Sequence, residues 1–318
     1  MSVQGRMRST SEKDRAHRTC RTIATLAVEA LMDEASLEGK PGLVCPSWNG
    51  AHRDMTYAHF LTSAAALGAS FMEIALTAWE FEGEQLATLL PLLRPTGIAA
   101  EQTMYRVTRG VNTHKGAIFT LGLCVAAAAW LLGHPDADPT DPMQHNTHLP
   151  SPLSDLAFHQ TIRAIAADIV RRDMEQAVPD THGKYWFAKA EVRGVRGQAE
   201  DGFPMLFDLL LPLFRTGNPS SPPTEAQQMQ ALLTSIAVLE DTCLLARGGM
   251  EGLAWAQTRA AAQLEAGTYS PSRDFASLAC MNEEFCSRNL SPGGSADMLA
   301  AALFIHALQR QSGGNLWP

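Results

Sequence analysis

One stretch of the chain combines glycine, basic and small polar side chains directly before a long apolar run. Residues 109–116 read Arg-Gly-Val-Asn-Thr-His-Lys-Gly, and residues 117–132 contain almost no polar side chain. This Ala- and Leu-rich run predicts a helix that is buried on most of its surface. Asn112 or Thr113 is a candidate N-cap, because a short side-chain oxygen there accepts from free N–H groups of the first turn.

His114 and Lys115 are expected at the positive end of this helix's dipole. A cation is unfavourable there unless an anion is bound as well, and helix N-termini bind phosphate groups well. The alternative is a lysine whose stem lies along the surface while its ammonium group stays in water. The segment therefore predicts a polyanion site, with Asn112 and Thr113 beside the two basic residues.

Further segments also place glycine next to charged side chains. Backbone N–H groups that glycine leaves accessible, together with guanidinium groups, suit the oxygens of phosphate. For the Arg-Gly segment at residues 193–204, the alternative is an exposed basic turn without a ligand. The basic and histidine side chains of these segments are Lys40, His52, Arg53, Arg193, Arg196 and Arg247.

The segment Ser-Pro-Gly-Gly-Ser-Ala-Asp at residues 291–297 precedes the last expected helix. Its glycines leave N–H groups free at the helix N-terminus, which is again an anion-binding geometry. Asp297 falls in the first turn, where a carboxylate either caps the helix or contributes to a site. With Asp54 and Asp241 it could hold a divalent cation that bridges phosphates.

Composition excludes several classes of protein. The 318 residues carry a formal net charge of -8, which argues against a general nucleic-acid surface. The cysteines form no C-x-x-C pair, so neither a zinc site nor a disulfide framework is indicated, as in a reducing cytoplasm. The N-terminus has no apolar signal segment, and residues 117–132 are too few for a membrane span. We expect a cytoplasmic protein without membrane contacts.

Apolar periodicity predicts helices along most of the chain, and no stretch alternates as a strand would. We expect an all-α fold with a disordered tail at residues 1–13 and a single multi-helix catalytic domain at residues 14–318. The site would be built from loops and helix N-termini. The predicted helices cover residues 14–37, 56–79, 84–93, 99–109, 117–132, 153–174, 205–214, 225–245, 250–265, 271–288 and a last one to about residue 309.

Two features of the loops bear on these boundaries. Pro95 is expected to stop the helix at residues 84–93, because proline ends or kinks helices. The loop at residues 133–152 contains His134, His145 and His148. These histidines lack the i, i+4 spacing of a helical metal site, so a metal role is not favoured for them.

Taken together and in order, several segments resemble the triphosphoribosyl-dephospho-coenzyme A synthases. The resemblance extends over residues 29–308. The citrate lyase branch of this family usually has Asp where Cys45 stands, so the stretch at residues 39–46 looks more like the malonate decarboxylase branch. The segments are GKPGLV at 39–44, NGAHRDM at 49–55, GVNTHKGAIF at 110–119, RGQAEDGFP at 196–204, DT at 241–242, RGG at 247–249 and SPGGSAD at 291–297.

The resemblance implies a transferase that moves the 5-triphosphoribosyl group of ATP to the 2′-hydroxyl of 3′-dephospho-coenzyme A and releases adenine. The product would be the prosthetic-group precursor for an acyl carrier subunit, passed on to a transferase that loads the carrier protein. A homodimer is left as an option. The family's product is α-linked and ATP is β-linked, so one inverting displacement through an oxocarbenium-like transition state is the simplest course.

This reaction needs a base for the hydroxyl proton, an acid for adenine and cations for the triphosphate. We expect Asp54 or His52 to be the base. Mg²⁺ would be held by Asp241 and Asp297, with Glu29 as a further candidate. The residues expected to contact the substrates and their phosphates are Lys40, Arg53, Asn112, Thr113, His114, Lys115, Arg193, Arg196, Arg247, Gly248, Gly249, Ser291, Gly293, Gly294 and Ser295.

Two other functions fit the same residues. A Mg²⁺-dependent, all-helical hydrolase of N-ribosyl bonds would use water as acceptor, so it would release adenine without dephospho-coenzyme A. A non-catalytic nucleotide-binding accessory protein would bind ATP and release no adenine.

Overall fold

The structure, a computed structural model, describes residues 10–139, 153–175 and 182–313. In these ranges the regular elements are helices, and the extended pairing is one isolated bridge between Cys45 and Trp48. The all-α prediction is therefore confirmed. Of the expected disordered tail, residues 1–9 lie outside the described part, whereas residues 10–13 already belong to the first helix.

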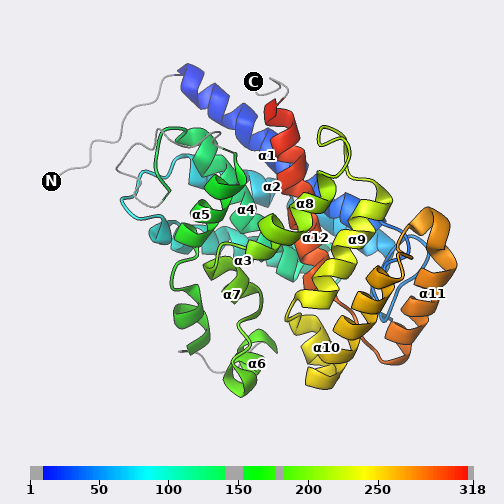
Figure 1. The fold of residues 1–318 in the computed structure, drawn as a ribbon. Coiled ribbons are helices and arrows are strands. Elements are labelled where there is room, and N and C mark those ends of the chain that lie inside the picture. Colours follow the sequence, from blue (N-terminus) through cyan, green and yellow to red (C-terminus); the bar gives the residue numbers. More distant parts are fainter. Residues whose placement is uncertain (1–9, 140–152, 176–181, 314–318) are drawn as a thin grey trace.

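The helices follow one another around a central element (Figure 1). Leu86–Thr88 (η1) is a 3-10 turn, and Arg171–Glu175 (η2) and Leu206–Leu210 (η3) are π-helical turns. The α-helices are α1 (Thr10–Ser36), α2 (Tyr57–Trp79), α3 (Leu89–Val107), α4 (Lys115–Gly133), α5 (Asp155–Ile165), α6 (His182–Ala190), α7 (Gly194–Glu200), α8 (Leu211–Phe214), α9 (Glu225–Val238), α10 (Thr242–Glu265), α11 (Pro271–Ser287) and α12 (Gly293–Gly313).

Helix α4 is the centre of the fold, as its apolar sequence predicts. It packs against α1, α2, α3, α5 and α12, which surround it on most sides. The four alanines at residues 126–129 are completely buried. Small side chains allow the neighbouring helices to approach closely, and burial of apolar surface is the main stabilising term in such a core.

Pro95 lies inside α3 and does not end a helix, so the prediction of two helices at residues 84–93 and 99–109 is wrong. Helix α3 is continuous from Leu89 to Val107. An internal proline lacks one N–H donor and disturbs the turn before it. Leu93, Ala100 and Met104 are nevertheless buried on one side of α3, and such packing contributes more to a helix in a protein than local propensity does.

Three other predicted boundaries differ from the structure. The helix predicted at residues 225–245 is interrupted, and α9 and α10 meet there at an angle of 55°. The helix predicted at residues 153–174 consists of α5, a turn and η2. The Arg-Gly segment at residues 193–204, where no helix was predicted, contains α7, and α6 precedes it. In each case the contacts of a short segment with its neighbours decide its conformation, which local periodicity does not report.

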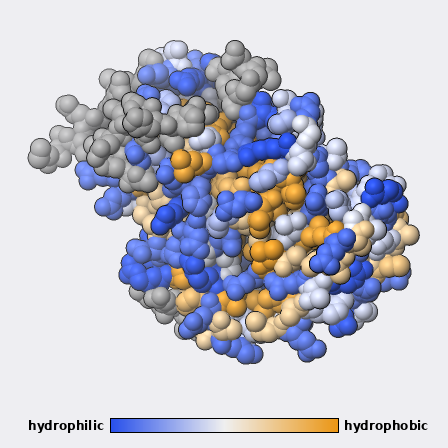
Figure 2. Space-filling model, in the orientation of Figure 1, coloured by the Kyte–Doolittle hydropathy of each residue, from blue (hydrophilic) through white to orange (hydrophobic). Residues whose placement is uncertain are grey.

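By length and apolar composition, α2 and α4 could each cross a membrane, and the bent pair α9 and α10 meets the same criterion together. In the most apolar window of α4, 78% of the residues are buried inside the protein, against 33% for α2. The apolar length of α4 is thus accounted for by its central position. Figure 2 shows apolar residues gathered near the centre of one face, between hydrophilic residues on both sides.

Candidate active site

Segments far apart in the sequence meet at the N-termini of α4, α10 and α12. At the start of α12, Ser295 donates its N–H and its hydroxyl to Oδ2 of Asp241, at 2.8 and 3.0 Å. Asp297 accepts from the N–H of Ala117 in the first turn of α4. Glu34, at the end of α1, is near enough for its charge to raise the pKa of Asp297. We call Glu34, Asp241 and Asp297 the carboxylate centre.

Asp241 caps two helices. Its Oδ1 accepts from the N–H groups of Cys243 and Leu244 at 2.8 and 3.3 Å, and its Oδ2 accepts both bonds from Ser295. Burial raises the pKa of Asp241, while these bonds oppose that rise. Because a carboxylate has about four acceptor positions, the fold already uses those of Asp241. Its predicted role as a metal ligand would require one of these bonds to break.

Asp297 faces the N-terminus of α4, so it does not simply cap its own helix. Its pKa lies well above the usual range because of burial first and then the charges of Asp241 and Glu34, while the N–H of Ala117 opposes the rise. Gly116 permits this approach, since a Cβ at that position would collide with Oδ2 of Asp297. The carboxylate thus occupies the anion position that the sequence assigned to a phosphate.

Gly294 plays the corresponding part at the start of α12. A Cβ there would lie 3.1 Å from Cγ of Asp241, and one at Gly293 would lie 3.0 Å from Sγ of Cys243. Both glycines therefore allow α12 to start close to the cap of α10. The backbone of Gly294 bonds to the thiol of Cys243, and the contact of both glycines with phosphate stays a prediction.

Lys40 is buried in an ion pair with Glu34, with 1% of its side chain exposed. Its ammonium group donates to Oε1 and to the carbonyl oxygen of Glu34, both at 2.6 Å. A buried charge is strongly destabilising unless it is paired. Lys40 therefore anchors the loop after α1, and its contact with phosphate stays a prediction that would require this ion pair to open.

Glu34, and not Glu29, is the carboxylate that α1 brings to the centre. Glu29 is exposed and does not belong to the carboxylate centre, and its role as a metal ligand stays a prediction. Glu34 shares the buried face of α1 with Ala27, Ala30 and Leu31, at spacings of i+7, i+4 and i+3. A carboxylate on an apolar stripe at helical spacing was the signal in the sequence that would have identified it.

His114 is a buried, neutral histidine directly before α4. Burial and then the charge of Lys40 lower its pKa to about 3. Its Nδ1 lies 2.8 Å from Oγ of Ser63, while its buried Nε2 has no hydrogen-bond partner. The predicted positive charge of His114 is therefore absent at neutral pH, and its imidazole is a polar group that faces the protein interior.

Asn112 and Lys115 are exposed residues at the start of α4. The N-cap of α4 is His114 and not Asn112 or Thr113 as predicted, but Oδ1 of Asn112 accepts from the N–H of Lys115 at 3.2 Å. Nζ of Lys115 lies 3.1 Å from Oε2 of Glu101 on α3, and 44% of the lysine side chain is exposed. The Oγ1 atom of Thr113 is buried without a hydrogen-bond partner. Lys115 is the accessible cation at this helix end.

His52 connects its loop to α10 and to the start of α12. An Arg247 guanidinium nitrogen lies 3.1 Å from Nδ1, so Nδ1 accepts, and Nε2–H donates to Oγ of Ser291 at 2.8 Å. Burial and the charge of Arg247 lower the pKa of His52 to about 4, against the opposite effect of Asp54. Arg247 also donates to the carbonyl oxygen of Ala51 and to Oδ1 of Asn289.

Asp54 and Arg53 lie at the rim of the same loop and are exposed. Oδ1 of Asp54 is 3.8 Å from Nδ1 of His52, and 66% of its side chain is exposed. The two residues predicted as bases thus differ, because hydrogen bonds occupy both ring nitrogens of His52 while the carboxylate of Asp54 is open to solvent. The contact of Arg53 with a substrate stays a prediction.

Gly248 and Gly249 shape α10. At Gly249 the backbone leaves the helical conformation, with φ 62° and ψ -162°, a region that favours glycine. Gly248 faces Leu290, and a Cβ there would lie 2.6 Å from Cδ2 of that side chain. These contacts give both glycines a part in the fold, and their predicted contact with phosphate remains untested.

Arg193 and Arg196 belong to α7 and its cap, so neither lies in a phosphate-binding loop. Arg193 pairs with Glu200 at 2.7 Å and Asp201 at 2.8 Å, which raises its pKa. Arg196 pairs with Asp173 at 3.2 Å. The start of α7 also touches the start of α10, because a Cβ at Gly194 would lie 2.8 Å from Cγ2 of Thr242.

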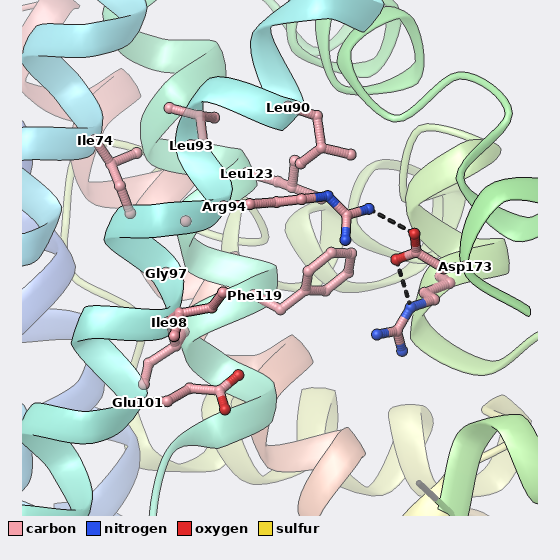
Figure 3. A pocket seen from close by; sticks show the side chains of 13 residues that line it. Ile74, Leu90, Leu93, Arg94, Gly97, Ile98, Glu101, Phe119, Leu123 and Asp173 are labelled. Atoms are coloured by element: carbon pink, nitrogen blue, oxygen red, sulfur yellow. Dashed lines mark hydrogen bonds and ion pairs between the residues drawn. The ribbon is translucent and has the colours of Figure 1, made fainter. Parts of the chain in front are cut away.

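A cleft lies between α3, α4, η2 and α7, and we call it the α3–α4 cleft (Figure 3). Its empty volume is about 740 Å³, including the part that is open to solvent. Arg94 and Asp173 face one another across its mouth, with Phe119 between them and the floor. The apolar lining residues are Ile74, Leu90, Leu93, Ile98, Ile118, Phe119 and Leu123.

The described residues contain no group of three or more His, Cys, Asp or Glu side chains that could hold a metal ion by themselves. Of the three loop histidines, His134 bonds to the carbonyl oxygen of Trp130 and stacks on its ring. His145 and His148 lie outside the described residues.

The sequence model of the family described as ATP:dephospho-CoA triphosphoribosyl transferase matches residues 20–316 of this chain. The chain belongs to this family. It is therefore an enzyme of the transferase class, and the matched region includes the carboxylate centre, the His52 loop and the α3–α4 cleft.

Curated relatives agree with this assignment. The chain is 35% identical over 303 residues to a protein of Vibrio cholerae serotype O1 named "Probable 2-(5''-triphosphoribosyl)-3'-dephosphocoenzyme-A synthase", covering 94% of this chain and 92% of that protein. It is 36% identical over 278 residues to the Pectobacterium atrosepticum protein named as that synthase, covering 87% and 86%. No solved structure matches the chain.

Proposed function

We propose that this transferase moves the 5-triphosphoribosyl group of ATP to the 2′-hydroxyl of 3′-dephospho-coenzyme A and releases adenine. Membership of the family supports this reaction. The observation that carries it to particular residues is that three segments of the resemblance, at residues 110–119, 241–242 and 291–297, meet at Asp297. That carboxylate is held by one backbone N–H and lies beside the negative charges of Asp241 and Glu34.

An excess of negative charge at this place favours a cation over a bare phosphate. In the described part of the chain Lys40 pairs with Glu34, while Asp241 and Asp297 are held by N–H and hydroxyl donors without a basic partner. Mg²⁺ commonly keeps several waters and binds to one or two carboxylates together with substrate phosphates. The residues therefore fit a magnesium ion that arrives with ATP, with Asp297 as its protein ligand. When bound, this ion would neutralise charge on the triphosphate.

The protein's own residues then position and activate the acceptor. The 2′-oxygen of the acceptor forms a bond to C1′ of the ATP ribose, and the C1′–N9 bond breaks. The electron pair of that bond leaves with adenine, which takes up a proton, and the hydroxyl proton passes to a base. We assign the base to Asp54, whose carboxylate is open, and we regard His52 as a residue that positions the loop.

Lys115 and Arg247 are the basic residues that flank this region and remain partly exposed. We propose that they contact the phosphates of the substrates. The stretch at residues 39–46 favours a product destined for the carrier subunit of malonate decarboxylase. A transferase that loads this carrier would then consume the product, in the cytoplasm, and the enzyme could act as a homodimer.

The experiment that tests the reaction measures adenine release from Mg²⁺ and ATP, with and without 3′-dephospho-coenzyme A. We expect release only with the acceptor, together with a product heavier by one triphosphoribosyl unit. Release without the acceptor would instead indicate an N-ribosyl hydrolase. ATP binding without any release would indicate a nucleotide-binding accessory protein.

Asp54→Asn tests the proposed base in the same assay. We expect adenine release to fall by about a hundredfold or more, with ATP binding largely unchanged. Asp208→Asn is the matched control, since Asp208 is an exposed carboxylate on η3 with no assigned role, and its activity should equal that of the wild type. An Asp54→Asn enzyme with a near wild-type rate would contradict the assignment.

A further inference from the structure

We propose that the α3–α4 cleft binds the pantetheine arm of the acceptor, with the acceptor's diphosphate at Arg94 and Arg196. This inference rests on the proposed function and names a binding site for one of its two substrates. It places the acceptor on the α3 side of the first turn of α4, and ATP on the side of the carboxylate centre.

The floor of the cleft suits an uncharged, flexible chain. It is mostly apolar, with Leu93, Ile118 and Leu123 among its lining residues. Gly97 opens it further, because a Cβ at that position would meet no atom within 4 Å. Ile98 is 59% exposed beside it. Burial of apolar surface would stabilise a bound alkyl-amide chain here.

The mouth of the cleft suits a diphosphate. Arg94 and Arg196 converge on the single carboxylate of Asp173, at 2.5 and 3.2 Å. Two guanidinium groups and one carboxylate give the mouth of the cleft a local net positive charge, although the net charge of the whole protein is negative. Guanidinium groups bind phosphate oxygens with good geometry. The more highly charged triphosphate would need more cations than this mouth provides.

The cleft is connected to the carboxylate centre through α4. Lys115, Ile118, Phe119 and Gly122 share one face of α4, because their spacing is i, i+3, i+4 and i+7. Lys115 pairs with Glu101, which itself lines the cleft. The next residue, Gly116, faces Asp297. One turn of helix therefore separates the apolar cleft from the carboxylates.

Helix α7 makes a second connection. At its start Gly194 lies against Thr242, which directly follows Asp241. Less than one turn later the guanidinium group of Arg196 lies over the ring of Phe119, 5.6 Å from its centroid. An acceptor whose pantetheine arm occupies the cleft would thus have its nucleotide end directed along α7 toward the carboxylate centre.

The test measures, by calorimetry, the affinity of the full-length protein for three ligands: 3′-dephospho-coenzyme A, ADP and ATP. ADP is the part of the acceptor that lacks the pantetheine arm. We expect the wild type to bind dephospho-coenzyme A at least about tenfold more tightly than ADP. In Gly97→Leu, whose side chain fills the cleft, this preference should disappear while the affinities for ADP and ATP stay unchanged. Gly97→Ala is the matched control and should keep the preference.

Gly97→Leu is expected to fold, because leucine favours a helix more than glycine does and the Cβ has free space. Arg94→Gln and Arg196→Gln should each lower the affinity for ADP and the affinity for dephospho-coenzyme A by about tenfold. Arg163→Gln, on the exposed side of α5, should leave both affinities unchanged. The proposal would be overturned if Gly97→Leu still bound dephospho-coenzyme A more tightly than ADP, or if this variant lost affinity for ATP alone. If dephospho-coenzyme A binds in this pattern but releases no adenine, the proposed function fails and the cleft assignment stands.

Discussion

Asp241 and Asp297 illustrate how two carboxylates in one centre take different roles. Asp241 accepts hydrogen bonds at both oxygens, whereas Asp297 is held by one backbone N–H and faces two other negative charges. The pKa of each is raised, chiefly by burial. We therefore expect Asp297 to be important for activity and Asp241 for stability.

Replacing Asp297 by Asn should separate these two properties. The amide keeps an oxygen for the N–H of Ala117 and removes the repulsion from Asp241 and Glu34, so the free energy of unfolding should be unchanged or higher. Adenine release should fall by about a hundredfold or more, because the charge that holds Mg²⁺ with ATP is lost. Activity assays at increasing Mg²⁺ concentration and urea unfolding would measure both effects.

Asp241→Asn is the matched comparison. Its amide nitrogen cannot accept, so the donors of either Ser295 or the start of α10 lose their partner, and we expect about 1–3 kcal/mol of destabilisation. If Asp297→Asn keeps full activity, or unfolds more easily than Asp241→Asn, the division of roles is wrong.

His114 should make the protein less stable in mild acid. Its pKa is lowered to about 3 in the folded state, while an unfolded histidine binds a proton below about pH 6.5. Between these values the unfolded state binds more protons, so stability is present above pH 6.5 and is lost as the pH falls. At pH 5 the loss attributable to His114 is about 2 kcal/mol.

Urea unfolding at pH 8 and pH 5 measures this loss. His114→Gln, which can still bond to Ser63, should show a pH dependence that is smaller by about this amount. Equal pH dependence in the two proteins would show that His114 is not kept neutral by the fold.

At the scale of elements, the start of α4 depends on one glycine. Gly116 lies in the first turn of the central helix, and a Cβ there would collide with Asp297. Alanine usually stabilises a helix relative to glycine by about 1 kcal/mol. Here we expect Gly116→Ala to destabilise the protein by about 1–3 kcal/mol and to raise the KM for Mg²⁺ and ATP, because Asp297 must move.

Gly122→Ala in the same helix is the control. A Cβ at Gly122 would lie 3.5 Å from Cδ1 of Ile74, which is an ordinary contact. This variant should be as stable as the wild type or more stable. Thermal unfolding compares the two, and a Gly116→Ala protein with wild-type stability would contradict the close approach of α12 to α4.

At the scale of the whole molecule, elements from both ends of the chain enclose α4. Helix α1 packs against α12, and both pack against α4. We propose that residues 14–318 form a single cooperative domain, and we expect one unfolding transition in calorimetry. Mg²⁺ with ATP at about a hundred times its Kd should raise Tm by about 4 °C, and dephospho-coenzyme A bound as well should raise it by about as much again. Two separate transitions, of which ligands shift only one, would argue for two domains.

The buried helix was the element most clearly predicted. Its run of small apolar residues from 117 to 132 predicts burial on all sides, and α4 extends over Lys115–Gly133. Boundaries were predicted well where caps and breakers agree with the hydrophobic period, as in α2 and α11. They were wrong at Pro95 and in the Arg-Gly segment, where tertiary contacts outweigh the local signal.

Composition, periodicity and ordered motifs are properties of the chain, so they were enough to predict the all-helical class, the central helix and the family. Which charged groups face one another could be read from the folded structure alone. It paired Lys40 with Glu34, placed Glu29 at the surface and set Asp297 against the start of α4. The reason is physical: the charge state and reach of a side chain depend on burial and on neighbours that are distant in sequence.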